Sequence, residues 1–176
     1  MSQQLPPSDD VVRDGERLQE LLDLDLLSDR EDPILQKLVS EATEELGLPI
    51  GLVSIVLHNA QYFAASKGLQ GWLKEVRGTP LEWSFCVNVV RDDAPFVVED
   101  ASHHPKVKDN PLVSQDGIRS YAGVPIRSRK GKVLGSFCVI GDRQRRFTEE
   151  EIERLNQWAD RAVARLEERR NSVRES

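Results

Sequence analysis

The sequence predicts an α+β domain in which helices from the two chain ends cover one face of a central antiparallel sheet of five to six strands. Two observations indicate helices. Apolar residues recur at helical spacing between residues 33 and 46, and again after residue 148. A third observation indicates the sheet. Between these segments lie short runs rich in β-branched and aromatic residues, joined in pairs by connections of hairpin length.

The leading part of the chain predicts an arm and two helices. Residues 1–14 are polar, acidic and proline-containing, so we expect a disordered acidic arm. Leucines within 18–27 indicate a short helix. Asp32 followed by Pro33 is typical of a helix start, with an N-cap side chain and proline at the first helical position. Gly47 ends this second helix.

The sheet is predicted from five apolar runs and the turns between them. The expected strands are 50–57, 61–66, 96–98, 120–127 and 132–140. Pro125 has no backbone N–H to donate, so its strand should lie at an edge or carry a bulge there.

Three further segments connect these strands. Residues 67–80 contain three glycines and no clear periodicity, and we expect a loop. Ser84 is expected to cap a short helix that runs to Arg91. Residues 100–117 predict a long loop with one helical turn, and long loops in compact domains often act as binding lids.

The last helix has the clearest start signal in the chain. Thr148 and Glu151 form a capping box, and Phe147 and Ile152 occupy the flanking positions of a hydrophobic staple. The helix is expected to end near residue 170, followed by a disordered tail at 171–176. Its apolar positions follow a seam pattern that suits either packing on its own sheet or a dimer interface: Ile152, Leu155, Ala159, Ala162 and Leu166.

Composition excludes several classes of protein. With 39% hydrophobic and 31% charged residues, the chain fits a soluble globular domain. It has no apolar run long enough to span a membrane and no secretory leader at its start. The two cysteines lie in apolar strings, which favours reduced thiols and a cytoplasmic location.

Charge argues against nucleic acid as a partner. The formal net charge is -6, and residues 1–32 alone carry 10 acidic and 3 basic side chains. The acidity therefore belongs to the leading segment, and the folded part is near neutral without an extended basic face. No metal site is expected either, because the three histidines and two cysteines are widely spread.

Cys86 is the candidate nucleophile. Its expected place in the first turn of a helix capped by Ser84 would lower the pKa of the thiol, although burial would oppose that. The alternative is a small apolar core residue, and for Cys138 that alternative is stronger. Trp72 and Trp83 flank the irregular region between the first hairpin and the short helix. An indole ring there can either line a ligand pocket or cover a small hydrophobic core.

Five strings, taken together in this order, resemble the GAF domains of bacterial signalling proteins. They are Trp83-Ser84-Phe85-Cys86, Val97-Val98-Glu99-Asp100-Ala101, Asp109-Asn110-Pro111-Leu112-Val113, Ile118-Arg119-Ser120-Tyr121-Ala122-Gly123-Val124-Pro125-Ile126 and Leu134-Gly135-Ser136-Phe137-Cys138-Val139-Ile140. The resemblance implies a single GAF domain over 15–170 with its core at 32–166. It also implies a PAS-like fold with a ligand pocket on the sheet face opposite the terminal helices.

The resemblance also implies where a ligand would bind. Position within the family pattern suggests that Trp83, Ser84, Cys86, Asp100 and Tyr121 border the pocket. The N-K-F-D-E pattern of cyclic-nucleotide-binding members, the cysteine–histidine pair of bilin carriers and the cysteine set of free methionine-R-sulfoxide reductases are all absent. We therefore expect no cofactor, and the small-molecule ligand is not named by the sequence.

Three functional hypotheses follow. The first is a small-molecule-sensing module that is not an enzyme. It would act in trans in signal transduction, as a homodimer through its terminal helices and with a signalling protein as partner. The second is a thiol-based redox sensor, or an enzyme similar to the free methionine sulfoxide reductases, that uses Cys86. The third is a ligand-free scaffold that binds a protein partner.

Overall fold

The computed structural model describes residues 11–24 and 32–175, with side chains described through residue 170. The helices are α2 (Gly15–Asp23), α3 (Pro33–Leu46), α4 (Trp72–Val76), α5 (Cys86–Asp92), α6 (Pro111–Ser114) and α7 (Glu149–Glu175). The strands are β1 (Ile50–Val56), β2 (Ala60–Lys67), β3 (Gly78–Pro80), β4 (Phe96–Val98), β5 (Ser120–Arg127) and β6 (Val133–Gly141). Two 3₁₀ turns, η1 (Leu81–Trp83) and η2 (Ala101–His103), complete the described elements.

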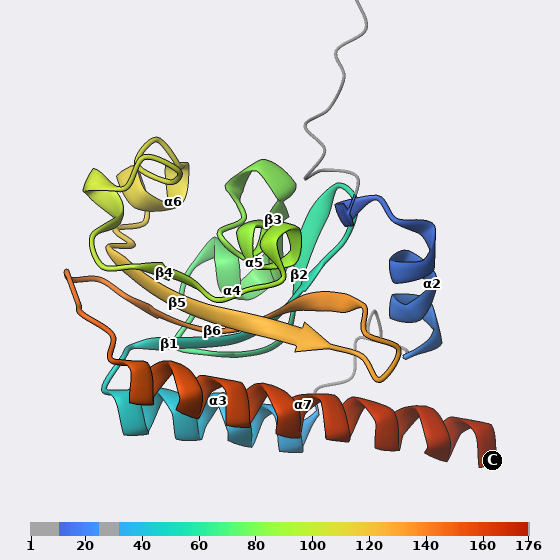
Figure 1. The fold of residues 1–176 in the computed structure, drawn as a ribbon. Helices are drawn as coiled ribbons and strands as arrows, with labels where there is room; N and C mark the ends of the chain where they lie inside the picture. Colours follow the sequence, from blue (N-terminus) through green and yellow to red (C-terminus); the bar gives the residue numbers. More distant parts are fainter. Residues whose placement is uncertain (1–10, 25–31, 176) are drawn as a thin grey trace, which may run out of the picture.

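The strands form one antiparallel sheet in the order β3-β2-β1-β6-β5-β4 (Figure 1). Both predicted hairpins are present, as β1–β2 and β5–β6, and pairing of β1 with β6 joins them. Almost every residue of β1 and all of β6 are buried, because both faces of the sheet are covered. The predicted α+β class is confirmed, with six strands.

Helices α3 and α7 lie side by side beneath one face of the sheet (Figure 1). Apolar side chains of β1 and β6, such as Val53 and Phe137, point to this side, and the Phe137 ring stacks on Trp158 with centroids 6.2 Å apart. Burying one such side chain contributes roughly 1.5–3 kcal/mol. Most of the predicted seam packs into this core: Leu155, Ala159, Ala162 and Leu166.

Capping fixes where α3 begins and ties it to α7. The Asp32 carboxylate accepts hydrogen bonds from the backbone N–H of Ile34, at 2.9 Å, and of Leu35, at 3.3 Å. The same carboxylate is paired with Arg165 at 2.9 Å and with Arg169 at 3.5 Å, both on α7. One buried acid therefore caps one helix and anchors another.

The predicted capping box at the start of α7 is confirmed. The backbone N–H of Glu151 donates to the Thr148 hydroxyl at 3.1 Å, and that of Thr148 donates to the Glu151 carboxylate at 3.0 Å. Arg145 contacts the same carboxylate at 2.7 Å and the carbonyl oxygen of Leu46 at 2.8 Å. The start of α7 is thus held against the end of α3. The backbone of α7 remains helical to Glu175, beyond its expected end near residue 170 and through most of the predicted disordered tail, because no glycine or proline interrupts it.

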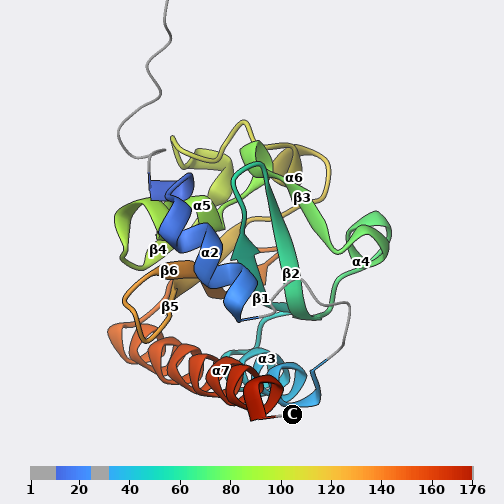
Figure 2. The ribbon, with the colours of Figure 1, turned by 90° about the vertical axis from the view of Figure 1, so that its right-hand side faces the viewer.

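Helix α2 does not lie on the sheet face that α3 and α7 cover, where the sequence predicts it. Instead, α2 lies across the end of the sheet, in front of the sheet in Figure 2. The buried Arg17 guanidinium donates to the carbonyl oxygens of Val56 at 2.7 Å and Val133 at 3.3 Å, at the ends of β1 and β6. Val12 is also buried, so residues 11–14 are not part of an exposed arm; residues 1–10 and 25–31 lie outside the described residues.

The prediction for residues 67–80 needs correction, and the one for Pro125 is met in part. The expected loop at 67–80 contains α4 and β3, and β3 pairs with β2 from Ala60↔Pro80 to Tyr62↔Gly78. A three-residue strand is too short to leave a pattern in the sequence. Pro125 does not lie on an edge strand, but β4 pairs only with Tyr121–Gly123 and ends before it, and a bulge follows at Ile126/Arg127.

The other face of the sheet is covered by α5, and α4 and α6 contribute Leu73 and Leu112 to the apolar core on that side. A second apolar core lies here, between the sheet and these short helices. Over residues 11–24 and 32–175, no helix is both long and apolar enough to cross a membrane.

Candidate functional site

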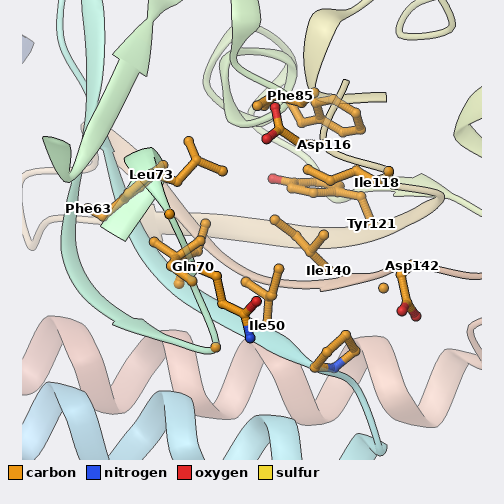
Figure 3. Close-up of a pocket in the computed structure, with 18 of the residues that line it drawn as sticks. Ile50, Phe63, Gln70, Leu73, Phe85, Asp116, Ile118, Tyr121, Ile140 and Asp142 are labelled. Atoms are coloured by element: carbon orange, nitrogen blue, oxygen red, sulfur yellow. The ribbon is translucent and has the colours of Figure 1, made fainter. Parts of the chain in front are cut away.

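A partly open cavity of about 590 Å³ lies between this face of the sheet and the short helices. Its floor comes from strands, with Ile50 from β1, Tyr121 from β5 and Ile140 from β6. Leu73 of α4 and Phe85, just before α5, close it from the other side (Figure 3). A volume of this size holds a small organic molecule.

The charged side chains that line the cavity in the described part of the chain are all acidic. Two carboxylates line it, Asp116 on the loop after α6 and Asp142 just after β6 (Figure 3). No lysine, arginine or histidine is among the described lining residues. Gln61, Gln70 and Gln115 add neutral hydrogen-bonding groups. The cavity therefore combines an apolar body with neutral and acidic polar groups.

Helix α4 forms one wall of the cavity and is hydrogen-bonded to the loop that follows α6. Trp72 Nε1 donates to Asp116 Oδ1 at 3.2 Å, and the Trp72 and Trp83 rings meet edge to face with centroids 5.7 Å apart. Gly71, at φ 62°, begins this helix without a side-chain cap, and Arg77 ends it at φ 59°. This five-residue helix, with positive φ angles at both ends, is held by these tryptophan contacts and by the buried Leu73 side chain.

A buried polar network extends from Gln61 in the cavity wall. The side-chain oxygen of Gln61 accepts from the Ser54 hydroxyl at 3.1 Å and from the Ser84 hydroxyl at 2.7 Å. Gln61 Nε2 donates to the Thr79 hydroxyl at 2.7 Å. Ser84 in turn accepts from the backbone N–H of Val87 at 3.1 Å, as the predicted cap of the short helix. The network fixes the start of α5 relative to three strands.

The two cysteines meet beside the cavity, with Cys86 in its lining and Cys138 behind it. Tyr121 donates a hydrogen bond from its hydroxyl to Cys86 Sγ at 3.1 Å, and its oxygen is 3.0 Å from Ser136 Oγ. Cys86 Sγ and Cys138 Sγ are 3.9 Å apart. Gly123 makes room for the tyrosine, since a Cβ there would collide with the Tyr121 and Ser136 hydroxyls.

This arrangement sets the pKa values of the three groups apart. Burial raises the pKa of the Cys86 thiol, but hydrogen bonds from Cys138, Tyr121 and the hydroxyls of Ser54 and Ser136 outweigh it and bring that pKa to about 7. Burial raises the pKa of Cys138 and of Tyr121, and a negative charge on Cys86 raises both further. Cys86 is therefore the thiol that ionises first.

The structure brings only part of the predicted site to the cavity. Cys86 and Tyr121 line it. Trp83 and Ser84 lie outside the lining, Trp83 against Trp72 and Ser84 against Gln61. Asp100 is not brought to the cavity: its carboxylate caps η2, accepting from the backbone N–H of Ser102 at 3.1 Å and contacting His103 Nδ1 at 2.8 Å.

Sequence reasoning missed the residues that become neighbours only in the fold. Gln61, Asp116, Ile118 and Asp142 line the cavity, although they come from different elements. The only sequence signals were the polar glutamine inside an apolar strand and the acid at the end of the long loop. Among the described residues, no group of three or more His, Cys, Asp or Glu side chains is placed to hold a metal ion.

Comparison with known proteins agrees with the fold. The family model described as the GAF domain matches residues 30–166. Over 146 residues, the chain is 37% identical to a cyclic di-GMP phosphodiesterase of Pseudomonas aeruginosa; the match covers 81% of this chain and 24% of that protein. The chain thus spans about a quarter of the length of that relative.

Two solved structures with low identity share the fold. The GAF domain of a phosphoenolpyruvate-protein phosphotransferase from Coxiella burnetii has a TM-score of 0.66 and 18% identity, over 96% of this chain and 99% of that one. A free methionine-R-sulfoxide reductase from Neisseria meningitidis, solved with its substrate, has a TM-score of 0.65 and 17% identity, over 98% of both chains. The resemblance inferred from the five sequence strings is confirmed, and the chain belongs to the GAF domain family.

Proposed function

We propose that this GAF domain is a sensory module that binds a small molecule in the cavity between the sheet and helices α4, α5 and α6. The observation that carries the proposal is the cavity itself, about 590 Å³ with an apolar floor and polar groups at its margin. The third hypothesis, a scaffold filled by its own side chains, is disfavoured by that volume.

The lining favours one class of ligand. Asp116 and Asp142 are the only charged groups among the described lining residues. A polyanion such as a nucleotide would meet two like charges and no cation, which costs binding free energy. We therefore propose a neutral or cationic ligand with an apolar body, its polar group directed to one of these carboxylates or to a glutamine.

The terminal helices are the elements through which we expect this module to contact a partner. We propose that binding is communicated through α7 to a signalling partner, either in trans or within a longer protein. The Pseudomonas phosphodiesterase supports a regulatory setting, but the match covers a quarter of it, and its activity is not carried over. A homodimer through the terminal helices would have to use their outward faces, since most of the predicted seam is buried within the domain. The two free thiols suit a reducing, cytoplasmic compartment.

A binding screen tests the cavity. Neutral, cationic and anionic compounds are compared by calorimetric titration of the wild-type protein and two variants. Ile50→Trp fills the cavity floor and is expected to weaken binding of any cavity ligand at least about tenfold. Leu22→Trp changes an exposed side chain on α2, which does not line the cavity, and should leave affinity unchanged. Equal affinity of the two variants would place the ligand elsewhere, and preferential binding of polyanions would refute the ligand class.

A further inference from the structure

The two cysteines lie 52 positions apart in sequence, and the fold places them together. Cys86 begins α5, and Cys138 lies in β6 at the centre of the sheet. Their sulfur atoms are 3.9 Å apart, and both thiols are free. Cys86 lines the cavity, whereas Cys138 does not and lies behind it, fully buried. A molecule in the cavity therefore reaches one sulfur of the pair first.

The surroundings of Cys86 suit a reactive thiol more than a packing residue. Its sulfur accepts a hydrogen bond from the Tyr121 hydroxyl, which is within hydrogen-bonding distance of Ser136. A chain of hydroxyl groups stabilises a thiolate without any nearby cation, and the pKa of about 7 agrees with this. The site is built by close packing, because only glycine fits at position 123 beneath the tyrosine.

The distance between the sulfur atoms is short enough for a bond to form without refolding. A disulfide has an S–S length of about 2.05 Å, so the two sulfur atoms have to approach each other by about 2 Å. Cys86 is the first residue of a seven-residue helix, whereas Cys138 is held on both sides by neighbouring strands. The start of α5 is therefore the part that moves.

We propose that Cys86 and Cys138 form an oxidisable dithiol site, at which a hydroperoxide that enters the cavity converts the pair into an intramolecular disulfide. Cys86 is the attacking thiol and Cys138 the resolving thiol, and Tyr121 is a positioning residue. This inference goes beyond the proposed function and does not depend on it, because the reaction needs no other ligand.

The reaction balances in two steps. The Cys86 thiolate attacks one oxygen of the hydroperoxide ROOH: an S–O bond forms, the O–O bond breaks, and RO⁻ takes up the proton that Cys86 released, giving ROH. Cys86 is then a sulfenic acid. The Cys138 sulfur attacks the Cys86 sulfur: the S–S bond forms, the S–O bond breaks, and hydroxide leaves as water with the Cys138 proton. The two thiols supply two electrons, and the peroxide accepts them.

The disulfide would change the cavity. Cys86 is part of the cavity lining, and closing the S–S bond draws it toward β6 and alters its contact with the Tyr121 hydroxyl. Disulfides in reducing compartments are usually transient and used for catalysis or sensing, so a reversible bond at this place would report peroxide. A thiol reductant would return the pair to its present geometry.

The experiment uses the full chain, fully reduced, with hydrogen peroxide or cumene hydroperoxide as the probe. After the reaction, free thiols are blocked with N-ethylmaleimide in denaturant and the intact mass is measured. The proposal predicts a monomer that is about 2 Da lighter and takes up no N-ethylmaleimide, and that a thiol reductant restores to two reactive thiols. Retention of both thiols under excess peroxide, or a disulfide formed only between two molecules, would overturn it.

Variants assign the roles. In Cys138→Ser the reaction should stop at a Cys86 sulfenic acid, which dimedone traps, and in Cys86→Ser the remaining thiol should not react over the same time.

Tyr121→Phe should slow Cys86 oxidation about tenfold and move its pH dependence to higher pH. The matched control is Tyr62→Phe, which alters the other tyrosine and should change neither quantity. Oxidation of Cys86→Ser as fast as wild type would overturn the assignment, and the wild-type result stands even if a variant folds poorly.

Discussion

At the residue scale, the floor of the cavity depends on the absence of a side chain at one position. Tyr121 and Ser136 lie on adjacent strands, and their hydroxyl groups meet over Gly123. The glycine here serves a close approach and not a turn, because its backbone lies in an extended strand. The contact between the Tyr121 and Ser136 hydroxyls, which positions the thiol site, therefore requires glycine at position 123.

We predict that Gly123→Ala lowers the free energy of unfolding by about 1 to 3 kcal/mol, because the added methyl group forces the two hydroxyls apart. Urea denaturation measures the loss. Gly15→Ala is the matched control, since a Cβ at the exposed start of α2 meets nothing within 4 Å. That change should alter stability by no more than about 1 kcal/mol, toward stabilisation. Equal effects of the two substitutions would contradict the close packing at Gly123.

The pH dependence of peroxide oxidation follows from the groups that face Cys86. These are the Tyr121 hydroxyl from β5 and the Cys138 thiol from β6, with Asp116 across the cavity. Only the thiolate attacks, so with a pKa of about 7 the rate should rise about tenfold per pH unit below that value and level off above it. The initial rate of thiol loss in wild-type protein between about pH 5 and pH 9 checks this. A rate that still rises about threefold between about pH 8 and pH 9, as for an ordinary thiol near 8.5, would contradict the lowered pKa.

At the scale of elements, the sequence signals that worked were those with a local physical cause. The N-cap of α3 at Asp32 and the capping box of α7 are single-turn interactions, so neighbouring residues identify them. Both hairpins were predictable because long β-branched runs flank short polar turns. Strand β3 was not, because its three residues pair only after β2 offers an open edge.

Asp32 joins two elements, and its substitution separates its two roles. Asp32→Ala removes both the cap of α3 and the pairing with Arg165, and should lower the free energy of unfolding by about 2 to 4 kcal/mol. Asp32→Asn keeps an oxygen for the cap and loses the charge, so a smaller loss is expected. Thermal unfolding of the three proteins measures the series. Losses of equal size in both variants would show that the cap contributes nothing.

At the scale of the whole molecule, the fold class and the family were predictable, whereas most of the site was not. Cys86 and Tyr121 were expected at the pocket and line it. Asp100 was inferred from its place in the family pattern, but its carboxylate is used in a local turn at η2. Gln61 and Asp116 reach the cavity from distant elements, and no spacing rule in one sequence brings them together.

The terminal helices act together across the molecule. Two buried acids, Asp32 before α3 and Glu20 on α2, bind arginines within the last described turns of α7: Asp32 binds Arg165, and Glu20 binds Arg170. A movement of α7 would therefore displace or break its ion pairs with α2 and with the start of α3. This arrangement is the basis for proposing that α7 carries the signal to a partner.

We propose that the cavity holds a small molecule, and native mass spectrometry of the protein purified from its own host tests this proposal. Wild type, Ile50→Trp and Leu22→Trp are measured in parallel, and the same spectra report the oligomeric state. We predict an additional non-covalent mass on wild type and on Leu22→Trp that is missing from Ile50→Trp, because the tryptophan occupies the floor of the cavity. A bare wild-type protein, or an additional mass that Ile50→Trp retains in full, would contradict it.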